Sequence, residues 1–373
     1  MRVVVVGGGI VGASVAYHLT RPDVTNGADV DVVVIDRAHT GKATLAGAGI
    51  VCPWPSMAAT GAYLELYLAG AGYYPTMIGD LADDEHRQKS IGYRRVGALV
   101  VSDHEEDLEA AEERTHRRAE GRPEVGSITR IGNREARELF PPLRHGVDAL
   151  RIEGAARVDG RLLSEAMLDA APVKRIEVRS GAATLTVDDG LVTGVRIDGD
   201  DLAADRVVVA GGAWTNELLE PVGPGLSVDV EPQKGQIVHL RVDADTSAWP
   251  VVMPVGLQYL VGFDDSRVVV GATRENDSGF DTRVTAGGQV QVLEAALAIA
   301  PGLADAEIIE TRVGLRPLAA GLPTVSRHPE VEGLVVGTGL GAGGLTMGPL
   351  CGRLLAEIAL DRQPSFDVTA YRT

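Results

Sequence analysis

Three glycines near the start of the chain have the spacing that binds a pyrophosphate. Gly7, Gly9 and Gly12 fill the G-x-G-x-x-G positions directly after Val3–Val6, an apolar run that predicts a strand buried on both faces. Gly7 permits a tight turn, Gly9 lets the backbone approach the phosphates, and Gly12 allows close helix packing. Helix-compatible residues follow, so free N–H groups and the helix dipole favour an anion here. The pattern predicts a dinucleotide site.

An acidic residue stands where the ribose of a dinucleotide would lie. A second buried strand is expected over residues 32–35 and ends at Asp36, whose carboxylate can accept hydrogen bonds from both hydroxyls of an adenosine ribose. Arg37 follows it; a basic residue there is common where FAD is held, but it can also mark a 2′-phosphate. This stretch alone therefore leaves NAD and FAD open.

Further glycine-rich loops occur far along the chain. Residues 41–55 are rich in glycine and alanine, which would let the backbone lie against a flat ligand. The buried apolar runs 206–210 and 333–337 also end in glycines. A single site lined by all these loops would explain their recurrence, whereas independent tight turns are the alternative.

Regular elements must position these loops. Helices are expected over residues 63–77, 105–119, 134–139, 162–171, 285–300 and 348–360, with Asn133 as the N-cap of the third. Strands are expected over 93–102 with a kink at Gly97, and over 128–131, 176–178, 183–187, 192–197, 235–242, 258–263, 267–272 and 307–315. The charged run 83–87 indicates a solvated boundary.

Composition narrows the class of protein. The 373 residues suffice for two domains, and the net charge of −17 argues against nucleic acid or an anionic membrane as a partner. Cys52 and Cys351 lack CxxC spacing and need no oxidising compartment, and the eight histidines lack ligand spacing, so no metal is expected. Met1 leads straight into the first strand, leaving no room for a signal peptide, and no apolar run approaches a membrane span. We expect a cytoplasmic protein, with its oligomeric state open.

Taken in order, the motifs resemble those of the FAD-dependent D-amino-acid oxidase superfamily, within it the branch of glycine oxidase, sarcosine oxidase and D-amino-acid dehydrogenase. They are GGGIVG with VVVIDR, YRRVGALVVS, RVVVAGGAW, PQKGQIVHL, RVVVGATRE, RVGLRPLAAGLPTVSRHP and GLGAGGLTMGP. The resemblance implies an α/β fold: a Rossmann-like FAD-binding domain with an inserted α+β substrate domain on a mostly antiparallel sheet. We assign residues 1–82, 141–224 and 312–373 to the first, and 83–140 and 225–311 to the second.

The resemblance also implies which residues form the site. Arg316 would pair with a substrate carboxylate and Tyr259 would lie on the substrate side; a structural ion pair and an ordinary strand aromatic are the alternatives. Arg312 and Arg274 are weaker candidates, and Lys234 is either near the flavin or solvated. The cofactor contacts expected are Gly7, Gly9, Ile10, Val11, Gly12, Asp36, Arg37, Ala46, Gly47, Ala48, Gly49, Ile50, Ala210, Gly211, Trp214, Arg316, Gly339, Leu340, Gly341, Gly343, Gly344, Leu345 and Thr346.

Two departures from the related sequences matter. Leu340 occupies a position that is usually histidine, and Ala342 and Gly343 stand where glycine oxidases carry an arginine, so a bulkier or less polar substrate than glycine is plausible. Sarcosine oxidases link flavin to a cysteine just after the position of Pro317, whereas residues 318–320 are Leu-Ala-Ala here. We therefore expect FAD to be bound non-covalently.

The function that these residues favour is oxidation of the amine of a small α-amino acid at FAD. Glycine, an N-substituted glycine or a D-amino acid would lose a hydride to the flavin, and the resulting imine would be hydrolysed. One alternative is a D-amino-acid dehydrogenase that passes electrons to a quinone. Another is a flavin-binding assembly protein without turnover.

Overall fold

The computed structural model describes residues 1–373 except 83–89, 171–175, 224, 257 and 373. A six-stranded sheet in the order β19-β20-β13-β1-β2-β9 carries the first glycine loop. All of its neighbours pair in parallel except β19 and β20, which are antiparallel. Its strands are β1 (Arg2–Val6), β2 (Asp31–Asp36), β9 (Glu177–Ser180), β13 (Arg206–Val209), β19 (Thr324–Arg327) and β20 (Leu334–Thr338).

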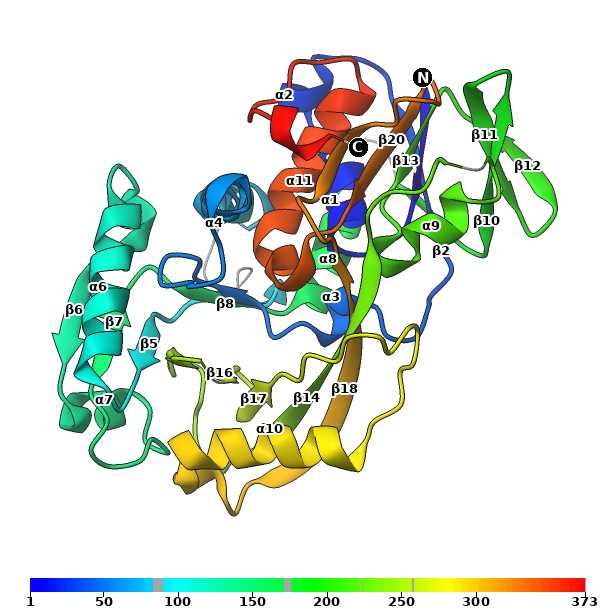
Figure 1. Cartoon of the computed structure of the whole chain (residues 1–373). Helices are drawn as coiled ribbons and strands as arrows, with labels where there is room; N and C mark the ends of the chain where they lie inside the picture. The colour runs from blue at the N-terminus through cyan, green and yellow to red at the C-terminus, as the bar shows by residue number, and fades with distance from the viewer. Residues whose placement is uncertain (83–89, 171–175, 224, 257, 373) are drawn as a thin grey trace.

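The side chains of β1 point alternately to the two faces of this sheet, and each face is covered by other elements. Val3 and Val5 pack in one cluster with residues of α1 (Ile10–His18) and α11 (Gly344–Ala359). Val4 and Val6 point the other way, into a cluster with the three-stranded sheet of β10 (Ala183–Asp188), β11 (Leu191–Ile197) and β12 (Asp200–Ala203). The helices and the small sheet therefore lie on opposite faces (Figure 1).

The second large sheet has eight strands in the order β18-β14-β17-β16-β15-β5-β7-β6. It is antiparallel except where β15 pairs with β5. Helices α10 (Ala286–Ile299) and α7 (Asn133–Leu139) cover one face of it (Figure 1). The strands are β5 (Ala98–Val101), β6 (Ile128–Ile131), β7 (Ala149–Ile152), β14 (Glu231–Arg241), β15 (Val251–Pro254), β16 (Tyr259–Gly262), β17 (Arg267–Gly271) and β18 (Glu307–Leu318).

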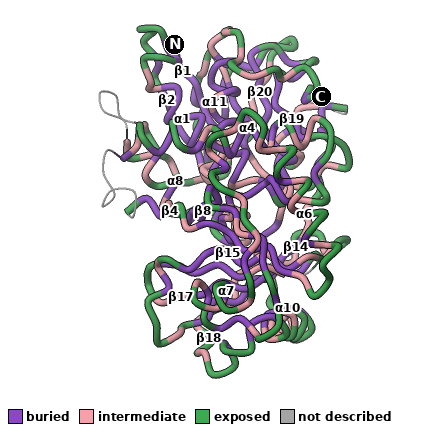
Figure 2. Tube along the Cα trace, turned by 90° about the vertical axis from the view of Figure 1, so that its left-hand side faces the viewer, coloured by how far each residue is buried: buried purple, intermediate pink, exposed green. Residues whose placement is uncertain are grey.

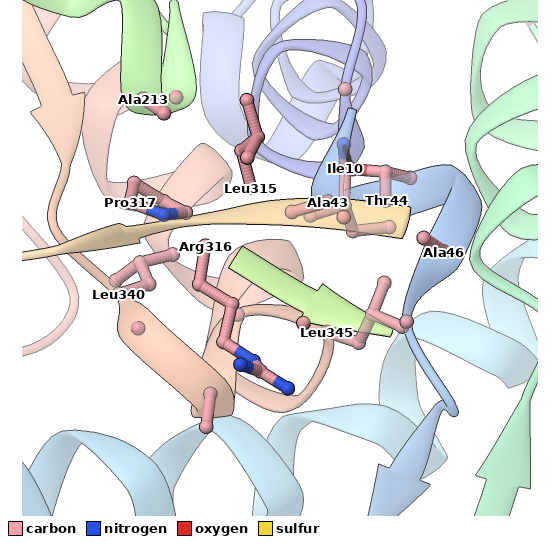
Figure 3. A pocket seen from close by; sticks show the side chains of 18 of the residues that line it. Ile10, Ala43, Thr44, Ala46, Ala213, Leu315, Arg316, Pro317, Leu340 and Leu345 are labelled. Carbon is pink, nitrogen blue, oxygen red and sulfur yellow. Dashed lines mark hydrogen bonds between the residues drawn. The ribbon is translucent and has the colours of Figure 1, made fainter. Parts of the chain in front are cut away.

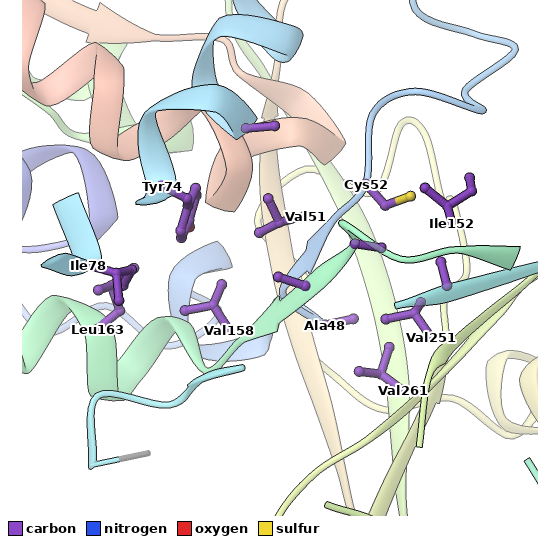
Figure 4. Packing of buried hydrophobic residues seen from close by; sticks show 14 of the residues in the cluster. Ala48, Val51, Cys52, Tyr74, Ile78, Ile152, Val158, Leu163, Val251 and Val261 are labelled. Atoms are coloured by element: carbon purple, nitrogen blue, oxygen red, sulfur yellow. The ribbon is translucent and has the colours of Figure 1, made fainter. Parts of the chain in front are cut away.

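A buried cluster joins the two large sheets. A small antiparallel sheet of β3 (Ile50–Val51), β8 (Ala156–Val158) and β4 (Tyr93–Arg95) lies between them. Its side chains pack with Tyr74 of α4 (Gly61–Leu81), Leu163 of α8 (Gly160–Asp169), and Val251 and Val261 of the eight-stranded sheet (Figure 4). Buried residues run continuously through this junction in Figure 2. The cluster fixes one sheet relative to the other.

The expected elements agree with the structure in most places. The kink at Gly97 is confirmed, since the residue has φ of +77° and separates β4 from β5. Residues 105–119 form α6 (Glu105–Ala119) as predicted. The expected β-rich blocks are present, although their bounds differ by a few residues. The charged run 83–87 lies outside the described residues, and the division into domains stays a prediction.

Two helix starts are corrected. Asn133 does not cap α7: Gly132 holds the N-cap position, while the Asn133 amide donates to the carbonyls of residues 144 and 147 and holds that turn. The last helix, α11, begins at Gly344 rather than at 348, with Pro349 inside it. Pro349 has no N–H for the Leu345 carbonyl, and the Tyr74 hydroxyl donates to that carbonyl at 2.6 Å instead. Tertiary contacts therefore let the helix start before its proline.

Candidate active site

A cavity of about 810 Å³ lies between the two large sheets, within the range of roughly 300–1,000 Å³ for small-molecule and cofactor sites. It brings together most of the predicted site residues, although they come from segments far apart in the chain. Those lining it are Gly7, Gly9, Ile10, Val11, Asp36, Arg37, Ala46, Gly47, Ala48, Gly49, Ile50, Ala210, Gly211, Trp214, Tyr259, Arg316, Leu340, Gly341, Gly344 and Leu345.

Four predicted residues lie just behind the cavity wall. A Cβ added to Gly12 would lie 1.8 Å from the Gly7 carbonyl oxygen, so Gly12 serves the packing of α1 on the turn. Thr346 donates its hydroxyl to the Ile50 carbonyl at 2.9 Å and ties two lining loops together. Gly339 and Gly343 pack against Ala319 and Tyr63 respectively. These residues shape the loops without facing the cavity.

One end of the cavity is built mainly from backbone. We call it the dinucleotide end and define it by Gly7, Gly9, Asp36, Lys42 and Ala210. Gly7 has φ of +111°, and a Cβ there would lie 2.3 Å from the Ala210 carbonyl oxygen, so no side chain fits. Gly9 is the N-cap of α1 and offers no side-chain cap; Thr44 accepts from the Ile10 N–H, and Val11 in the same first turn lines the cavity. This end suits a pyrophosphate.

Asp36 is held in place by three donors. Its Oδ2 accepts from the Gly8 N–H at 2.9 Å and from the Lys42 ammonium at 2.5 Å, and its Oδ1 accepts from the Ala38 N–H at 2.7 Å. Burial raises the pKa of this carboxyl, but the hydrogen bonds from Lys42, Ala38 and Gly8 outweigh it, so the pKa lies below its ordinary value. An ionised, fixed carboxylate in this place suits ribose hydroxyls.

Lys42 and the Gly8 N–H were not anticipated from the sequence. Lys42 lines the cavity inside segment 41–55, whose sequence pattern predicts only backbone contacts through glycine and alanine. Thr44 was also missed, although its Oγ1 accepts from the Ile10 N–H at 2.9 Å. A lysine and a threonine beside the G-x-G-x-x-G turn become visible only once the fold closes this segment over α1.

Another part of the cavity lining is built from long side chains, and we call it the arginine end: Arg114, Arg274, Arg316 and Tyr259. Arg316 leaves β18 on the face opposite Leu315 (Figure 3). Its Nη1 donates to the Thr273 carbonyl at 3.1 Å and to Gln233 Oε1 at 3.3 Å. The guanidinium lies over Gly235, where a Cβ would be 2.5 Å from Nη2. Burial lowers the pKa of Arg316.

Tyr259, on β16, lies beside Arg316 of β18. Burial raises the pKa of its hydroxyl, while the positive charges of Arg316 and Arg274 act in the opposite direction and only partly offset it. The hydroxyl therefore stays protonated near neutral pH and can both donate and accept a hydrogen bond. The two predicted substrate-side residues are thus brought together in the cavity.

The three weaker candidates are resolved differently. Arg312 pairs with Glu310 at 2.6 Å and donates to the Leu45 carbonyl, outside the cavity lining. Arg274 lines the cavity and has no ion-pair partner among the described residues. Lys234 is not solvated: it is 1% exposed, does not line the cavity, and pairs with Glu275 at 3.5 Å and Asp281 at 3.2 Å.

The charged residues that line the cavity fall into two groups. Among the described residues, its only acidic lining side chains are Asp36 and Glu217, and Glu217 pairs with Arg37 beside Asp36. The arginine end presents three guanidinium groups with no lining carboxylate in the part of the chain that the structure describes. That end is suited to an anionic ligand, next to the site suited to a dinucleotide.

Other kinds of centre find no support in the described part of the chain. No group of histidine, cysteine, aspartate and glutamate there has the geometry of a metal site. Cys52 and Cys351 are both buried, and neither lines the cavity. Among the described helices, none has the length and apolar character needed to cross a membrane. Non-covalent attachment of a flavin stays a prediction that acid release of the flavin would test.

Comparison with known proteins agrees with this geometry. The chain is 48% identical to Uncharacterized oxidoreductase YurR of Bacillus subtilis (strain 168), over 99% of this chain and 97% of the relative. The crystal structure of iminodiacetate oxidase from Chelativorans sp. BNC1 superposes with a TM-score of 0.92 at 47% identity, covering 100% of this chain and 98% of that one. Glycine oxidase of Pseudomonas aeruginosa (strain PAO1) is 29% identical over 99% and 98% of the two chains.

The family itself is defined by a match over almost the whole chain. Residues 2–358 match the DAO family, described as FAD dependent oxidoreductase. The dinucleotide end fits that cofactor: a Cβ-free turn, the N-terminus of α1 and an ionised carboxylate stand where a pyrophosphate and a ribose would be held. The protein is therefore a member of the DAO family of FAD-dependent oxidoreductases.

Proposed function

We propose that the protein oxidises N-substituted glycines, small secondary amines that carry an N-carboxymethyl group. The observation that carries this proposal is the arginine end, where three guanidinium groups meet no lining carboxylate among the described residues. A similar protein, at 47% identity over the full chain, is an iminodiacetate oxidase, and iminodiacetate is an N-substituted glycine with two carboxylates. Glycine oxidases are also similar, but at lower identity.

Arg316 holds the carboxylate next to the reacting carbon, and Arg274 adds a second positive charge. A guanidinium offers parallel N–H donors that match a carboxylate and fix its orientation as well as its charge. The Thr273 carbonyl and Gln233 hold Arg316 in its place, so it needs no rearrangement to bind. Orientation matters because the reacting carbon must lie near contact distance, about 3–3.5 Å, from its acceptor.

The neutral phenol of Tyr259 orients the substrate amine. Its raised pKa keeps the proton on the hydroxyl, so the oxygen can accept a hydrogen bond from the substrate N–H. A hydrogen bond in this place directs the carboxymethyl carbon, rather than the other substituent, into the cavity.

The flank near Leu340 favours a substituted amine over glycine itself. Leu340 is 3% exposed and lines the cavity, and Ala342 lines it beside Leu340. Neither side chain offers a charge or a hydrogen bond to a primary ammonium group. The carbon attached to the substituted nitrogen would pack against this apolar wall and gain from the water that it displaces, while a charged group further along the substituent lies elsewhere in the cavity.

When bound, FAD supplies the two-electron acceptor for this oxidation. The substrate loses a C–H bond of its carboxymethyl group and the amine proton, and a C=N bond forms. Water then adds to that bond and splits the imine into glyoxylate and a free amine. The arginine end keeps the carboxylate fixed while these bonds change.

Product analysis tests the proposal. Purified protein with its flavin would be incubated with iminodiacetate, sarcosine, glycine and D-alanine, each with oxygen and, in parallel, with an artificial electron acceptor. We expect glyoxylate from iminodiacetate and sarcosine, with kcat/KM above that for glycine and D-alanine. Fastest oxidation of D-alanine would contradict the proposal. Turnover with the artificial acceptor alone would place the protein among dehydrogenases.

A further inference from the structure

A positively charged side chain of the cavity has no role in binding the reacting carboxylate. Arg114 comes from α6 and lines the cavity together with residues 55–58, Val100 and Met253. Its Nε donates to the Pro55 carbonyl at 3.0 Å, and no other hydrogen bond or ion pair to a described residue involves its guanidinium. Burial lowers the pKa of Arg114, with Arg117 adding to the effect. A half-buried guanidinium facing a cavity without a counter-ion is unfavourable unless an anion joins it.

Arg118, one turn further along α6, shows what a purely structural arginine does in the same place. Its Nη1 donates to the carbonyls of Trp54 and Ser56, and its Nη2 donates to the carbonyl of Ala59. Arg118 does not line the cavity. The loop 54–59 is therefore held mainly by Arg118, and the two Nη groups of Arg114 are left for a ligand.

The remaining cations of the cavity are accounted for. Lys42 pairs with Asp36 and Arg37 pairs with Glu217, both at the dinucleotide end. Arg316 lies over Gly235 on β14 and is adjacent to Tyr259 on β16, with Arg274 close to both. Arg114 instead comes from α6, which packs on β5 in a cluster that contains Leu108, Ala111 and Val100. In the eight-stranded sheet β5 is two strands from β16, a separation of about 10 Å.

Accordingly, we propose that Arg114 determines specificity for the N-substituent, by binding an anionic group at its far end. The proposal rests on the proposed function, which places the carboxymethyl group at Arg316 and Tyr259. The substituent then extends along β15 and β5 toward α6, over Met253 and Val100. The preferred substrates are dianionic secondary amines, one carboxylate at each end, and sarcosine lacks the group that Arg114 recognises.

Binding of non-reacting analogues tests Arg114 without requiring turnover. Thiodiacetate has a carboxylate at both ends and methylthioacetate has one, and sulfur replaces the oxidisable amine in both. Each would be titrated into the flavin-loaded protein while the flavin absorbance spectrum is followed. In Arg114→Met we expect thiodiacetate to bind about 10–100-fold more weakly, the range for a lost charge-assisted hydrogen bond, with methylthioacetate unchanged.

Two further variants separate recognition from loop structure. Arg114→Lys keeps the charge and should recover part of the loss, whereas Arg118→Met loosens the loop and should leave the preference for thiodiacetate intact. Equal weakening of both analogues in Arg114→Met, or the same selective loss in Arg118→Met, would overturn the proposal.

Kinetic measurements distinguish a failure of the Arg114 proposal from a failure of the proposed function. If no N-substituted glycine is oxidised but thiodiacetate binding still depends on Arg114, the proposed function is wrong and the anion site stands. If sarcosine and iminodiacetate are both oxidised and Arg114→Met changes neither KM, the proposed function stands and the role of Arg114 is wrong.

Discussion

The dinucleotide end of the cavity is built mainly from backbone groups, and the arginine end is built mainly from side chains. The dinucleotide end relies on backbone: a turn without Cβ atoms at Gly7 and Gly12, and helix N–H groups after Gly9. The arginine end relies on long side chains from four elements, namely α6, β16, β18 and the segment after β17. A backbone site tolerates almost no substitution, whereas a side-chain site can be retuned one residue at a time. Mutations at the dinucleotide end should therefore abolish FAD binding, whereas mutations at the arginine end should alter activity or substrate preference.

The largest effect is expected at Gly12. In Gly12→Ala the new Cβ would lie 1.8 Å from the Gly7 carbonyl oxygen, so α1 or the turn must move and FAD should be lost. The flavin content per protein and the Tm measure this. Gly79→Ala on α4 is the matched control, because nothing lies within 4 Å of the Cβ it adds. Full flavin content in Gly12→Ala would show that the turn is more adaptable than its geometry indicates.

At the arginine end, Arg316 should change activity without changing FAD retention. Arg316→Lys keeps the charge but loses the parallel donors, so kcat/KM should fall about 10–100-fold, or roughly 1.5–3 kcal/mol. Arg316→Ala should lose more. Arg312→Lys is the control, since Arg312 lies on the same strand but pairs with Glu310 outside the cavity. Normal kinetics in both Arg316 variants would make Arg274 the first candidate for the carboxylate.

These two ends also differ in how far the sequence predicts them. Backbone contacts require glycine at fixed spacing, so the turn at Gly7, the acid Asp36 and the later glycine loops are visible without a structure. Arg316 and Tyr259 were found only through resemblance to relatives. Arg114 was not found, because α6 is rich in charge and resembles an exposed helix until the fold brings it against residues 55–58.

The missed strands have a similar cause. β3, β7, β8, β12, β15 and β19 are only two to four residues long, and β15 pairs in parallel with β5, whose residues lie far away in sequence. Nothing local distinguishes such short runs from loops. The burial of Lys234 was also unpredictable, since its partners Glu275 and Asp281 come from a separate segment.

A side-chain contact at the dinucleotide end should give an intermediate effect. Asp36→Ala should weaken FAD binding by about 1.5–3 kcal/mol, roughly 10–100-fold, because a charged hydrogen-bond acceptor is removed. Equilibrium dialysis of the flavin measures it. Glu217→Ala is the control, since Glu217 lines the same end but forms a largely exposed pair with Arg37. An unchanged affinity in Asp36→Ala would exclude the ribose role.

Asp36 should also give a pH dependence on the acid side. Its folded pKa is below the ordinary value of about 3.9, so its stabilisation is complete above that pH and is lost as pH falls through the folded pKa. The Tm difference between wild type and Asp36→Asn should therefore shrink as the pH is lowered below about 4. A difference that is constant with pH would mean that the carboxylate contributes nothing through its charge.

The smallest effect on activity is expected at Lys234. This buried lysine pairs with Glu275 and Asp281, which follow Arg274 in the segment after β17, and it does not line the cavity. In Lys234→Met the backbone hydrogen bonds between residues 234 and 275 remain, so KM should rise a few-fold with kcat unchanged, while the Tm falls. A fall in kcat with unchanged KM would instead indicate a direct part in the reaction.

Anaerobic reduction of the flavin tests whether a substrate bound at the arginine end reduces FAD bound at the dinucleotide end. Flavin-loaded protein would be mixed with iminodiacetate or sarcosine without oxygen, and the absorption band of oxidised flavin followed over time. We expect complete bleaching in wild type, and much slower bleaching in Arg316→Ala at equal flavin content. A flavin that stays oxidised with every N-substituted glycine, glycine and D-amino acid would contradict the account and favour a flavin-binding assembly protein without turnover.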